Sequence, residues 1–557
     1  MSRPSVIHCV LLSTLLLSLS HLGFADEPSV TIQKVSGNRM LIALFESNSH
    51  VSRACRVDEP ILAKLESLDI RAAATCSDSV FVRRVYLDVI GTLPTAEEVK
   101  GFLEDRNINK RRLLIDRLLE RDKFADYWAM KWCDLLRVRS EFPINLWPNA
   151  VQAYHRWIRD SIRQNKPYDQ FVRELLTANG SNFRNPEVNF YRAVRDNKPE
   201  TIAAAVALTF MGTRADAWPS KRLSEMAVFF EGIQRKSTAE WKEEIVFVNL
   251  LDASIESAGG RPTSASFPDG TRVDLLPMVD HRQVFADWLV RAENPWFTGS
   301  IVNRVWYWLL GIGIIHEPDD IRRSNPPSNR ELLSLLQCEL VKSEYDIKHL
   351  FRLILNSATY QRSCIPTTDR PEAERNFAHY PIRRLDAEVL IDAICRITGT
   401  SETYKSLIPE PWTFIPGDQP SIALPDASIT SPFLELFGRP ARDTGFELER
   451  NNAPTAEQML HLLNSSHLLD KLESRWNPQT SATSPRFGRR VRRSVAAPQS
   501  AQADVTDVYL SLLSRYPTSH ELEVIRKYTS EAEAQGNEAM VDLMLSLINT
   551  PEFLYRH

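Results

Sequence analysis

One helix-start signal occurs three times in the chain and constrains its fold more than any other feature. Each copy reads Pro, then Thr or Ser, then Glu three residues later. This is a capping box, in which the hydroxyl and the carboxylate bond the first free backbone N–H groups of a helix. Capping boxes alone are common, but each copy also closes, about 30 residues later, with two aliphatic residues and an aromatic one, which together predict three copies of one helical hairpin. The caps are Thr95, Ser328 and Thr518, and the closing phrases are Leu118-Leu119 to Phe124, Ile354-Leu355 to Tyr360 and Leu547-Ile548 to Phe553.

Aromatic residues recur at helical spacing in two further segments. Exposed tryptophans could stack against sugars, but at helical spacing they more often line a core, so we expect two buried helix faces. The caps and stripes together predict a mainly α, multi-helical protein of two domains, with capped helical-hairpin repeats. A few short β-strands are expected near the N-terminus and in the interdomain segment. The stripes are Phe124, Tyr127, Trp128, Trp132 and Leu135 in the first segment, and Val302, Trp306 and Leu309 in the second.

Changes in periodicity along the chain predict how it is divided. With 557 residues, of which 43% are hydrophobic, the chain is long enough for more than one domain. Gly, Pro, Ser and Thr accumulate between two helical regions and indicate an irregular interdomain segment. The chain is predicted to start with a signal peptide over residues 1–25 and an extension over residues 26–58, which contains a short hairpin at residues 30–45. A helical domain over residues 59–253 and the interdomain segment over residues 254–280 follow. The second helical domain covers residues 281–557 and contains an irregular stretch at residues 409–431 and a mobile insert at residues 477–504.

The first 25 residues have the pattern of a cleavable signal peptide. Arg3 precedes an apolar run over residues 6–19, and Gly23-Phe24-Ala25 places small residues where a signal peptidase reads them. An uncleaved anchor is the alternative, but the run is shorter than the roughly 20 residues that a spanning helix needs. We therefore expect an exported protein of the periplasm or cell surface, without a transmembrane segment after cleavage. Six cysteines remain, too few for a disulfide scaffold, and Cys55 with Cys76 is the best candidate for a bonded pair.

The charge of the chain is nearly balanced. Lys and Arg number 67 against 71 Asp and Glu, which argues against nucleic acid as a partner. The predicted insert is nevertheless basic. A cluster of this kind could capture an acidic surface or a polysaccharide, or it could be a solvated linker. The cluster consists of Arg486, Arg489, Arg490, Arg492 and Arg493.

Several long phrases resemble a known pair of domains. Trp128-Ala-Met-Lys-Trp132 and residues 81–95 and 236–245 resemble the planctomycete cytochrome-associated domain DUF1549. Residues 281–289, 301–306, 384–388 and 460–464 are similar to its companion, DUF1553. The resemblance implies export but no established reaction. Relatives often carry an N-terminal cytochrome-type domain, which we do not expect here because there is no room for it before Glu59.

The same resemblance points to residues that this chain lacks. Many relatives carry a Cys-x-x-Cys-His phrase at the position of residues 213–219, and a Cys-x-Cys phrase where Phe446 and Leu448 stand here. In those relatives the cysteines suit haem attachment, a soft metal or a pair of disulfides. Because both sets are replaced together, we expect no haem, metal or other cofactor in this chain. We also expect residues 213–219 to pack near Phe446 and Leu448, with Trp218 filling part of the volume.

No nucleophile-elbow, zinc-protease, P-loop or dinucleotide motif is present in the sequence. The best polar constellation contains an Arg with paired carboxylates, which could orient a sugar or carboxylate substrate, or could be a buried ion-pair network that pins helices together. A concave pocket uniting these groups would favour an enzyme acting on an extracellular glycan or a related small molecule. Their dispersal would favour a noncatalytic binding or assembly protein that acts on cell-surface or envelope proteins or on polysaccharide. The candidate residues are His281, Asn303, Arg304, Arg384, Asp386 and Glu388.

Overall fold

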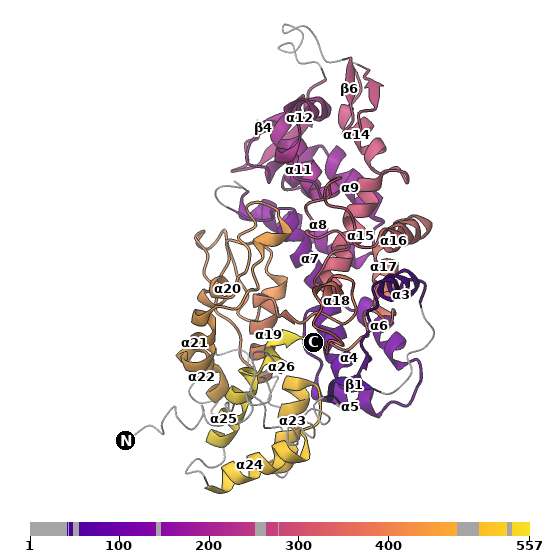
Figure 1. Cartoon of the computed structure of the whole chain (residues 1–557). Helices are drawn as coiled ribbons and strands as arrows, with labels where there is room; N and C mark the ends of the chain where they lie inside the picture. The colour runs from indigo at the N-terminus through magenta and orange to yellow at the C-terminus, as the bar shows by residue number, and fades with distance from the viewer. Residues whose placement is uncertain are drawn as a thin grey trace.

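The fold of this chain is mainly helical, as the capping and periodicity signals predict (Figure 1). Helices from the two ends of the chain lie side by side, because α23 near the C-terminus packs on α5 near the N-terminus. The computed structural model describes residues 42, 44–47, 55–140, 146–250, 263–276, 278–475, 501–531 and 537–557.

The first part of the chain is a series of helices with local start and stop signals. The Ser77 hydroxyl accepts a bond from Val80 N–H at the start of α4, and Gly91 ends that helix at φ +62°. The helices are α3 (Asp58–Ser67), α4 (Asp78–Ile90), α5 (Ala96–Glu104), α6 (Lys110–Leu119), α7 (Asp122–Leu135), α8 (Pro148–Arg163), α9 (Tyr168–Thr177), α10 (Asn189–Arg192), α11 (Pro199–Met211) and α12 (Ser220–Ala227), with 3-10 turns η1 (Pro186–Val188), η2 (Ala215–Ala217) and η3 (Val228–Phe230).

The second part of the chain is also a series of helices with local start and stop signals. The long helix α15 begins at Asn294, whose side chain accepts from Trp296 N–H and Phe297 N–H, and Gly311 ends it at φ +75°. The elements are α14 (His281–Leu289), α15 (Pro295–Leu310), α16 (Arg330–Lys342), α17 (Ile347–Leu355), α18 (Pro371–Arg375), α19 (Ala387–Thr398), α20 (Pro432–Leu436), α21 (Ala456–Asn464), α22 (Ser466–Ser474), α23 (Ala501–Leu513), α24 (Ser519–Glu531), α25 (Asn537–Ile548) and α26 (Pro551–Leu554), with 3-10 turns η4 (Ser421–Ala423) and η5 (Glu447–Glu449).

The strands are short and antiparallel. The largest sheet of the described residues has the order β3-β5-β4, with Ile233 opposite Val248 and Gly180 opposite Val246. The last strand, β9, pairs with β8 and ties the C-terminus to the second half of the chain. The strands are β1 (Glu46–Ser47), β2 (Thr75–Cys76), β3 (Gly180–Ser181), β4 (Ile233–Ser237), β5 (Glu244–Val248), β6 (Ser264–Ser266), β7 (Arg272–Asp274), β8 (Arg383–Arg384) and β9 (Tyr555–Arg556).

Two of the three predicted caps are confirmed. Thr95 and Glu98 form a complete capping box at α5, and Thr518 and Glu521 form the same pair of bonds at α24. The prediction for Ser328 is wrong by one residue. The Ser328 hydroxyl donates to Ile314 C=O, 3.2 Å away, and the Asn329 side chain accepts from Leu332 N–H instead. Asn329 is the better cap here because its amide also donates to Pro60 C=O and so ties α16 to α3.

The predicted repeat corresponds to three pairs of consecutive helices, α5–α6, α16–α17 and α24–α25, of which α16 and α17 pack on each other. Their closing aromatic residues are all buried. The second and third copies also close with the same bonds. Ser357 Oγ donates to Ile354 C=O and accepts from Tyr360 N–H, and Thr550 Oγ1 forms the equivalent pair with Leu547 and Phe553. The second and third units therefore share the structure of their closing turns, whereas α7 of the first unit starts at Arg121 without a side-chain cap.

The two aromatic stripes are buried, as predicted. Trp128 of the first stripe lies 5.2 Å from Trp308 of α15, a residue outside the second stripe, whereas Trp306 of the second stripe lies 5.1 Å from Phe377, both between ring centroids. The buried hydrophobic residues form one continuous core that extends from Val57 to Phe553. The two halves of the chain are therefore joined by apolar packing.

Two local predictions need correction, and three others fall wholly or largely on residues that the structure does not describe. Cys55 and Cys76 are not bonded: the Cys55 thiol lies 3.9 Å from Leu353 C=O and the Cys76 sulfur lies 3.9 Å from Arg111 Nη1. Residues 501–504, which were predicted to belong to the insert, belong to α23. The signal peptide, nearly all of the residue 30–45 hairpin and the arginine cluster lie outside the described residues. Within the described ranges, no helix combines the length and the apolar character needed to cross a membrane.

Candidate functional site

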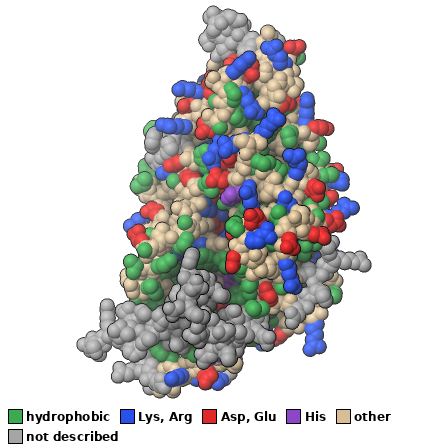
Figure 2. Space-filling view, viewed as in Figure 1, with side chains coloured by type: hydrophobic (Ala, Val, Ile, Leu, Met, Phe, Trp, Pro, Cys, Tyr) green, Lys and Arg blue, Asp and Glu red, His purple; other side chains and the backbone are tan. Residues whose placement is uncertain are grey.

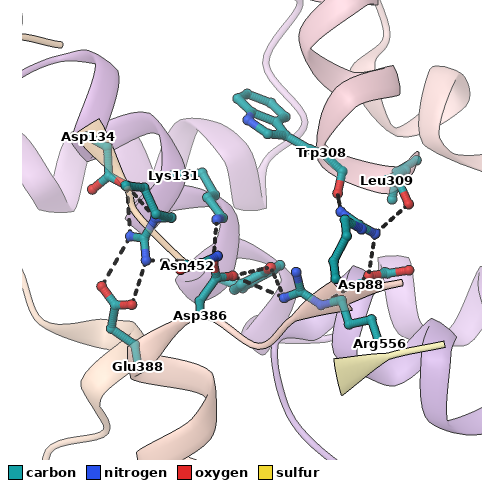
Figure 3. Close-up of polar contacts among 12 residues, drawn as sticks. Asp88, Lys131, Asp134, Trp308, Leu309, Asp386, Glu388, Asn452 and Arg556 are labelled. Carbon is teal, nitrogen blue, oxygen red and sulfur yellow. Dashed lines mark hydrogen bonds and ion pairs between the residues drawn. The ribbon is translucent and has the colours of Figure 1, made fainter. Parts of the chain in front are cut away.

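The densest group of buried charges lies where α7 meets the second half of the chain (Figure 3). We call it the junction network. Lys131 and Asp134 project from α7 three residues apart, which places them on one side of the helix. From the other half come Asp386 and Glu388 at the start of α19, and Arg450 just after η5. The network therefore joins segments that are more than 250 residues apart in the sequence.

Asp386 is bonded on both of its oxygens. Oδ1 accepts from Lys131 Nζ at 3.1 Å and from Asn452 Nδ2 at 2.8 Å, and Oδ2 accepts from Tyr127 Oη at 3.2 Å and Arg556 Nη2 at 3.0 Å. Burial by itself would raise the pKa of Asp386, but the cations around it hold the pKa well below its ordinary value. Asp386 is therefore an ionised structural centre.

Glu388 and Asp134 share the guanidinium of Arg450. Arg450 donates to both oxygens of Glu388, at 2.6 and 3.1 Å, and to Asp134 at 2.8 Å. Arg442 donates to the other oxygen of Asp134 at 2.8 Å, and Arg439 lies 3.4 Å from Glu388. Burial disfavours the Arg450 cation, but its carboxylates raise the pKa well above the ordinary value. These groups form a network of alternating charge with little access to solvent.

A fourth carboxylate, Asp88 of α4, extends the network. It accepts from the Tyr360 and Tyr380 hydroxyls at 2.8 and 2.9 Å, and Arg383 and Arg556 lie 3.4 and 3.3 Å away. Arg383 also donates to the carbonyls of Trp308 and Leu309 at 2.8 and 2.7 Å (Figure 3). These are free carbonyls at the end of α15, where a cation is favoured.

Glu447 differs from the other carboxylates of this region. It accepts from Trp308 Nε1 at 2.8 Å, and its backbone N–H donates to Asp319 at 2.7 Å. Burial raises the pKa of Glu447 to about 7, with Lys131 acting in the opposite direction. Burial likewise lowers the pKa of Lys131. Glu447 is therefore a carboxyl group that can exchange a proton near neutral pH.

The six candidate residues do not form one site. Asp386 and Glu388 lie in the junction network. Arg304 is fully buried, pairs with Asp319 at 2.9 Å and donates to Leu208 C=O at 2.7 Å. The Asn303 side chain bonds both backbone groups of Ile315 at 2.8 Å.

The two other candidates lie apart from the carboxylates. Arg384 bonds Gln458 and stacks 5.0 Å from the Phe437 ring centroid. His281 Nε2 lies 3.2 Å from Leu276 C=O at the start of α14. A cavity of about 40 Å³ between α7, α9, α15 and α17 is lined by aromatic side chains such as Trp132 and Tyr168, and by none of the six candidates.

Several members of the network were not among the candidate residues predicted from the sequence. They include Lys131, Asp134, Glu447, Arg450 and Arg556. Lys131 and Asp134 carried a usable signal, because they lie inside an otherwise aromatic helical stripe. The partners of these two residues carried no comparable signal, because they lie in irregular segments or at the C-terminus.

The predicted proximity of residues 213–219 and Phe446 is confirmed at one position. The Arg214 guanidinium lies 5.3 Å from the Phe446 ring centroid and also pairs with Glu317 at 2.6 Å. Trp218 instead contacts Arg222, 4.1 Å from its ring centroid, and Leu448 is 44% exposed. Among the described residues, no three His, Cys, Asp or Glu side chains come together as a metal ion would require.

Comparison with known families agrees with the sequence phrases. Residues 56–222 match PSCyt2, described as a protein of unknown function (DUF1549). Residues 281–529 match PSD1, described as a protein of unknown function (DUF1553). Neither a curated protein nor a solved structure matches the chain. The chain therefore belongs to the family of proteins in which a DUF1549 domain is followed by a DUF1553 domain.

Proposed function

We propose that this chain is an exported, noncatalytic binding or assembly protein of the periplasm or cell surface. The proposal rests on one observation: the best catalytic candidates, Asp386 and Glu388, are already bonded within the protein. Both oxygens of Asp386 and both oxygens of Glu388 bond protein cations or donors. A carboxylate that acts as an acid or base must reach its substrate, and these two are occupied by their own protein. Their role is to hold the two halves together.

The surface charge supports a partner other than nucleic acid. Basic and acidic side chains are interspersed on the face shown in Figure 2. A nucleic-acid site usually has a continuous basic area instead. The partners that we propose are cell-surface proteins, envelope proteins or polysaccharides.

The test uses the mature protein, expressed with export. It is incubated with envelope material and with a panel of polysaccharides, and both retention and product release are measured. We expect retention without release of new reducing ends. Turnover of any polysaccharide in the panel would contradict the noncatalytic proposal.

The second candidate function is an enzyme acting on an extracellular glycan or related small molecule, with Glu447 as its acid or base, although Glu447 is also buried and bonded to Trp308. Its pKa of about 7 suits a group that donates or accepts a proton at neutral pH. If turnover is found, Glu447→Gln should reduce it at least about 100-fold, the typical contribution of a general acid or base. A matched Glu435→Gln change on the surface of α20 should leave it unchanged.

A further inference from the structure

Three tryptophans and a lysine meet on the surface, away from the aromatic core. We call Trp147, Trp241, Lys242 and Trp412 the tryptophan surface. The ring centroids of Trp147 and Trp412 are 6.2 Å apart, and the ring planes make an angle of 65°. Lys242 Nζ lies 5.6 Å from the centroid of Trp147 and 5.6 Å from that of Trp241. The four side chains are therefore contiguous, and the lysine lies between two indoles at cation–π distance.

Three of these side chains are exposed, and Trp147 is partly buried. Trp241 is 67% exposed and Trp412 is 51% exposed, and Phe414 nearby in the sequence is 70% exposed. The indole is the largest apolar side chain, and an exposed cluster of such rings is a feature of recognition surfaces. The rings of Trp241 and Trp412 are therefore accessible to a ligand from solvent.

The rings are brought together from three distant segments. Trp147 immediately precedes α8, Trp241 and Lys242 lie in the turn between β4 and β5, and Trp412 lies in the irregular stretch of the second half. Lys242 has φ +62°, a left-handed conformation that non-glycine residues rarely adopt. This conformation is usual in the turn of a β-hairpin, which here joins β4 and β5.

We propose that the tryptophan surface binds a polysaccharide that carries anionic groups, carboxylate or sulfate. The C–H face of a pyranose ring is apolar and packs against an indole face, whereas the hydroxyls around its edge stay in water. Two indoles inclined at 65° form an angled corner, which can hold one sugar ring against each wall. The inference rests on the proposed binding function and names its ligand class.

The lysine provides the argument for negative charge on the ligand. Lys242 forms no ion pair with any residue that the structure describes. The two carboxylates that follow it in the sequence are engaged elsewhere, because Glu243 bonds Ser181 and Thr238, and Glu244 bonds Arg192. An ammonium group between two indoles is therefore available for a charge-assisted bond to an anionic substituent.

The test measures binding of the mature protein to dextran, carboxymethyl dextran and dextran sulfate, which share one backbone and differ in charge, and to alginate. We expect binding to at least one anionic polymer and weaker binding to dextran. Trp241→Ala and Trp412→Ala should each reduce the affinity at least tenfold. Lys242→Met should reduce the affinity for the anionic polymer and leave the weaker binding to dextran unchanged. Carboxymethyl dextran and dextran sulfate distinguish the two anionic groups.

Two controls separate this inference from the binding proposal. Tyr516→Ala removes an exposed aromatic ring beside α24, which lies at the opposite end of the molecule from β4 (Figure 1), and should not affect affinity. A variant in which the five arginines between residues 486 and 493 are replaced by alanine should keep the tryptophan-dependent part of the binding. If the wild type binds but the tryptophan variants bind equally well, the tryptophan surface is not the site and the binding proposal stands. If the wild type binds none of the polymers below about 1 mM, the polysaccharide inference is overturned.

Discussion

The junction network and the tryptophan surface are built from the same two halves of the chain, but they treat their functional groups in opposite ways. In the junction network, Asp386 is buried and bonded by four donors. On the tryptophan surface, Trp241 and Trp412 are more than half exposed and contact few neighbours. The difference shows that a cluster of chemically capable side chains is a candidate site only if its groups are left accessible.

The charges of the junction network can be buried because they pair with opposite charges within it. A buried ion pair contributes little net stability when compared with apolar packing, but removal of one partner leaves an uncompensated charge. The junction network therefore specifies one arrangement of the two halves. The tryptophan surface lies across the same boundary, so its geometry depends on that arrangement.

The largest expected effect comes from Asp386→Ala, which leaves Lys131 buried without its ion-pair partner and removes one of the two carboxylates next to Arg556. The free energy of unfolding should fall by about 3–5 kcal/mol, measured by urea denaturation. Asp287→Ala is the matched control, because it removes a carboxylate that pairs with Arg173 on the surface and should cost at most about 1 kcal/mol. Equal losses in the two variants would show that the junction network is no more than a set of surface-like pairs.

A second effect is pH-dependent and comes from Glu447→Gln. The pKa of Glu447 is about 7 in the folded protein, above the ordinary value, so the folded state binds this proton more tightly. Its stabilising contribution is present at acidic pH and is lost as the pH rises through about 7. The variant should therefore gain stability over the wild type between about pH 5 and 8, by on the order of 3 kcal/mol at most. Urea midpoints across this range provide the measurement, and a pH-independent difference would show that Glu447 ionises normally.

Substitutions at the helix caps should change the free energy of unfolding by an intermediate amount. Asn329→Ala should reduce the free energy of unfolding by about 1–2 kcal/mol, because Asn329 caps α16 and also bonds Pro60. Ser328→Ala, one residue earlier, should cost less because its hydroxyl does not cap the helix. A larger loss for Ser328→Ala would restore the cap predicted from the sequence.

The smallest effect on stability is expected at the tryptophan surface. Trp412→Ala should change the free energy of unfolding by less than about 1 kcal/mol, because about half of the side chain is already in water. Trp308→Ala in the core should cost about 3–5 kcal/mol and is the matched comparison. Thermal unfolding of the two variants measures the difference. A large loss for Trp412→Ala would mean that this ring serves packing and would weaken the case for recognition.

The local features of the fold could be predicted because their signals are local. The stripe that begins at Phe124 and the caps at Thr95 and Thr518 depend on residues three or four positions apart. The exception at Ser328 is instructive, because a tertiary bond from Asn329 to Pro60, 269 residues away, favours the neighbouring residue as cap.

The sequence by itself therefore determined the helical class, the helix starts at Thr95 and Thr518, the buried stripes and the family. Only the tertiary structure decided that Lys131 meets Asp386, 255 residues away, and that Trp147 meets Trp412. The physical reason is that helix formation depends on spacing within one or two turns, whereas these contacts depend on how packed helices bring distant segments together. Accessibility, which separates a structural carboxylate from a binding tryptophan, is a property of that packing.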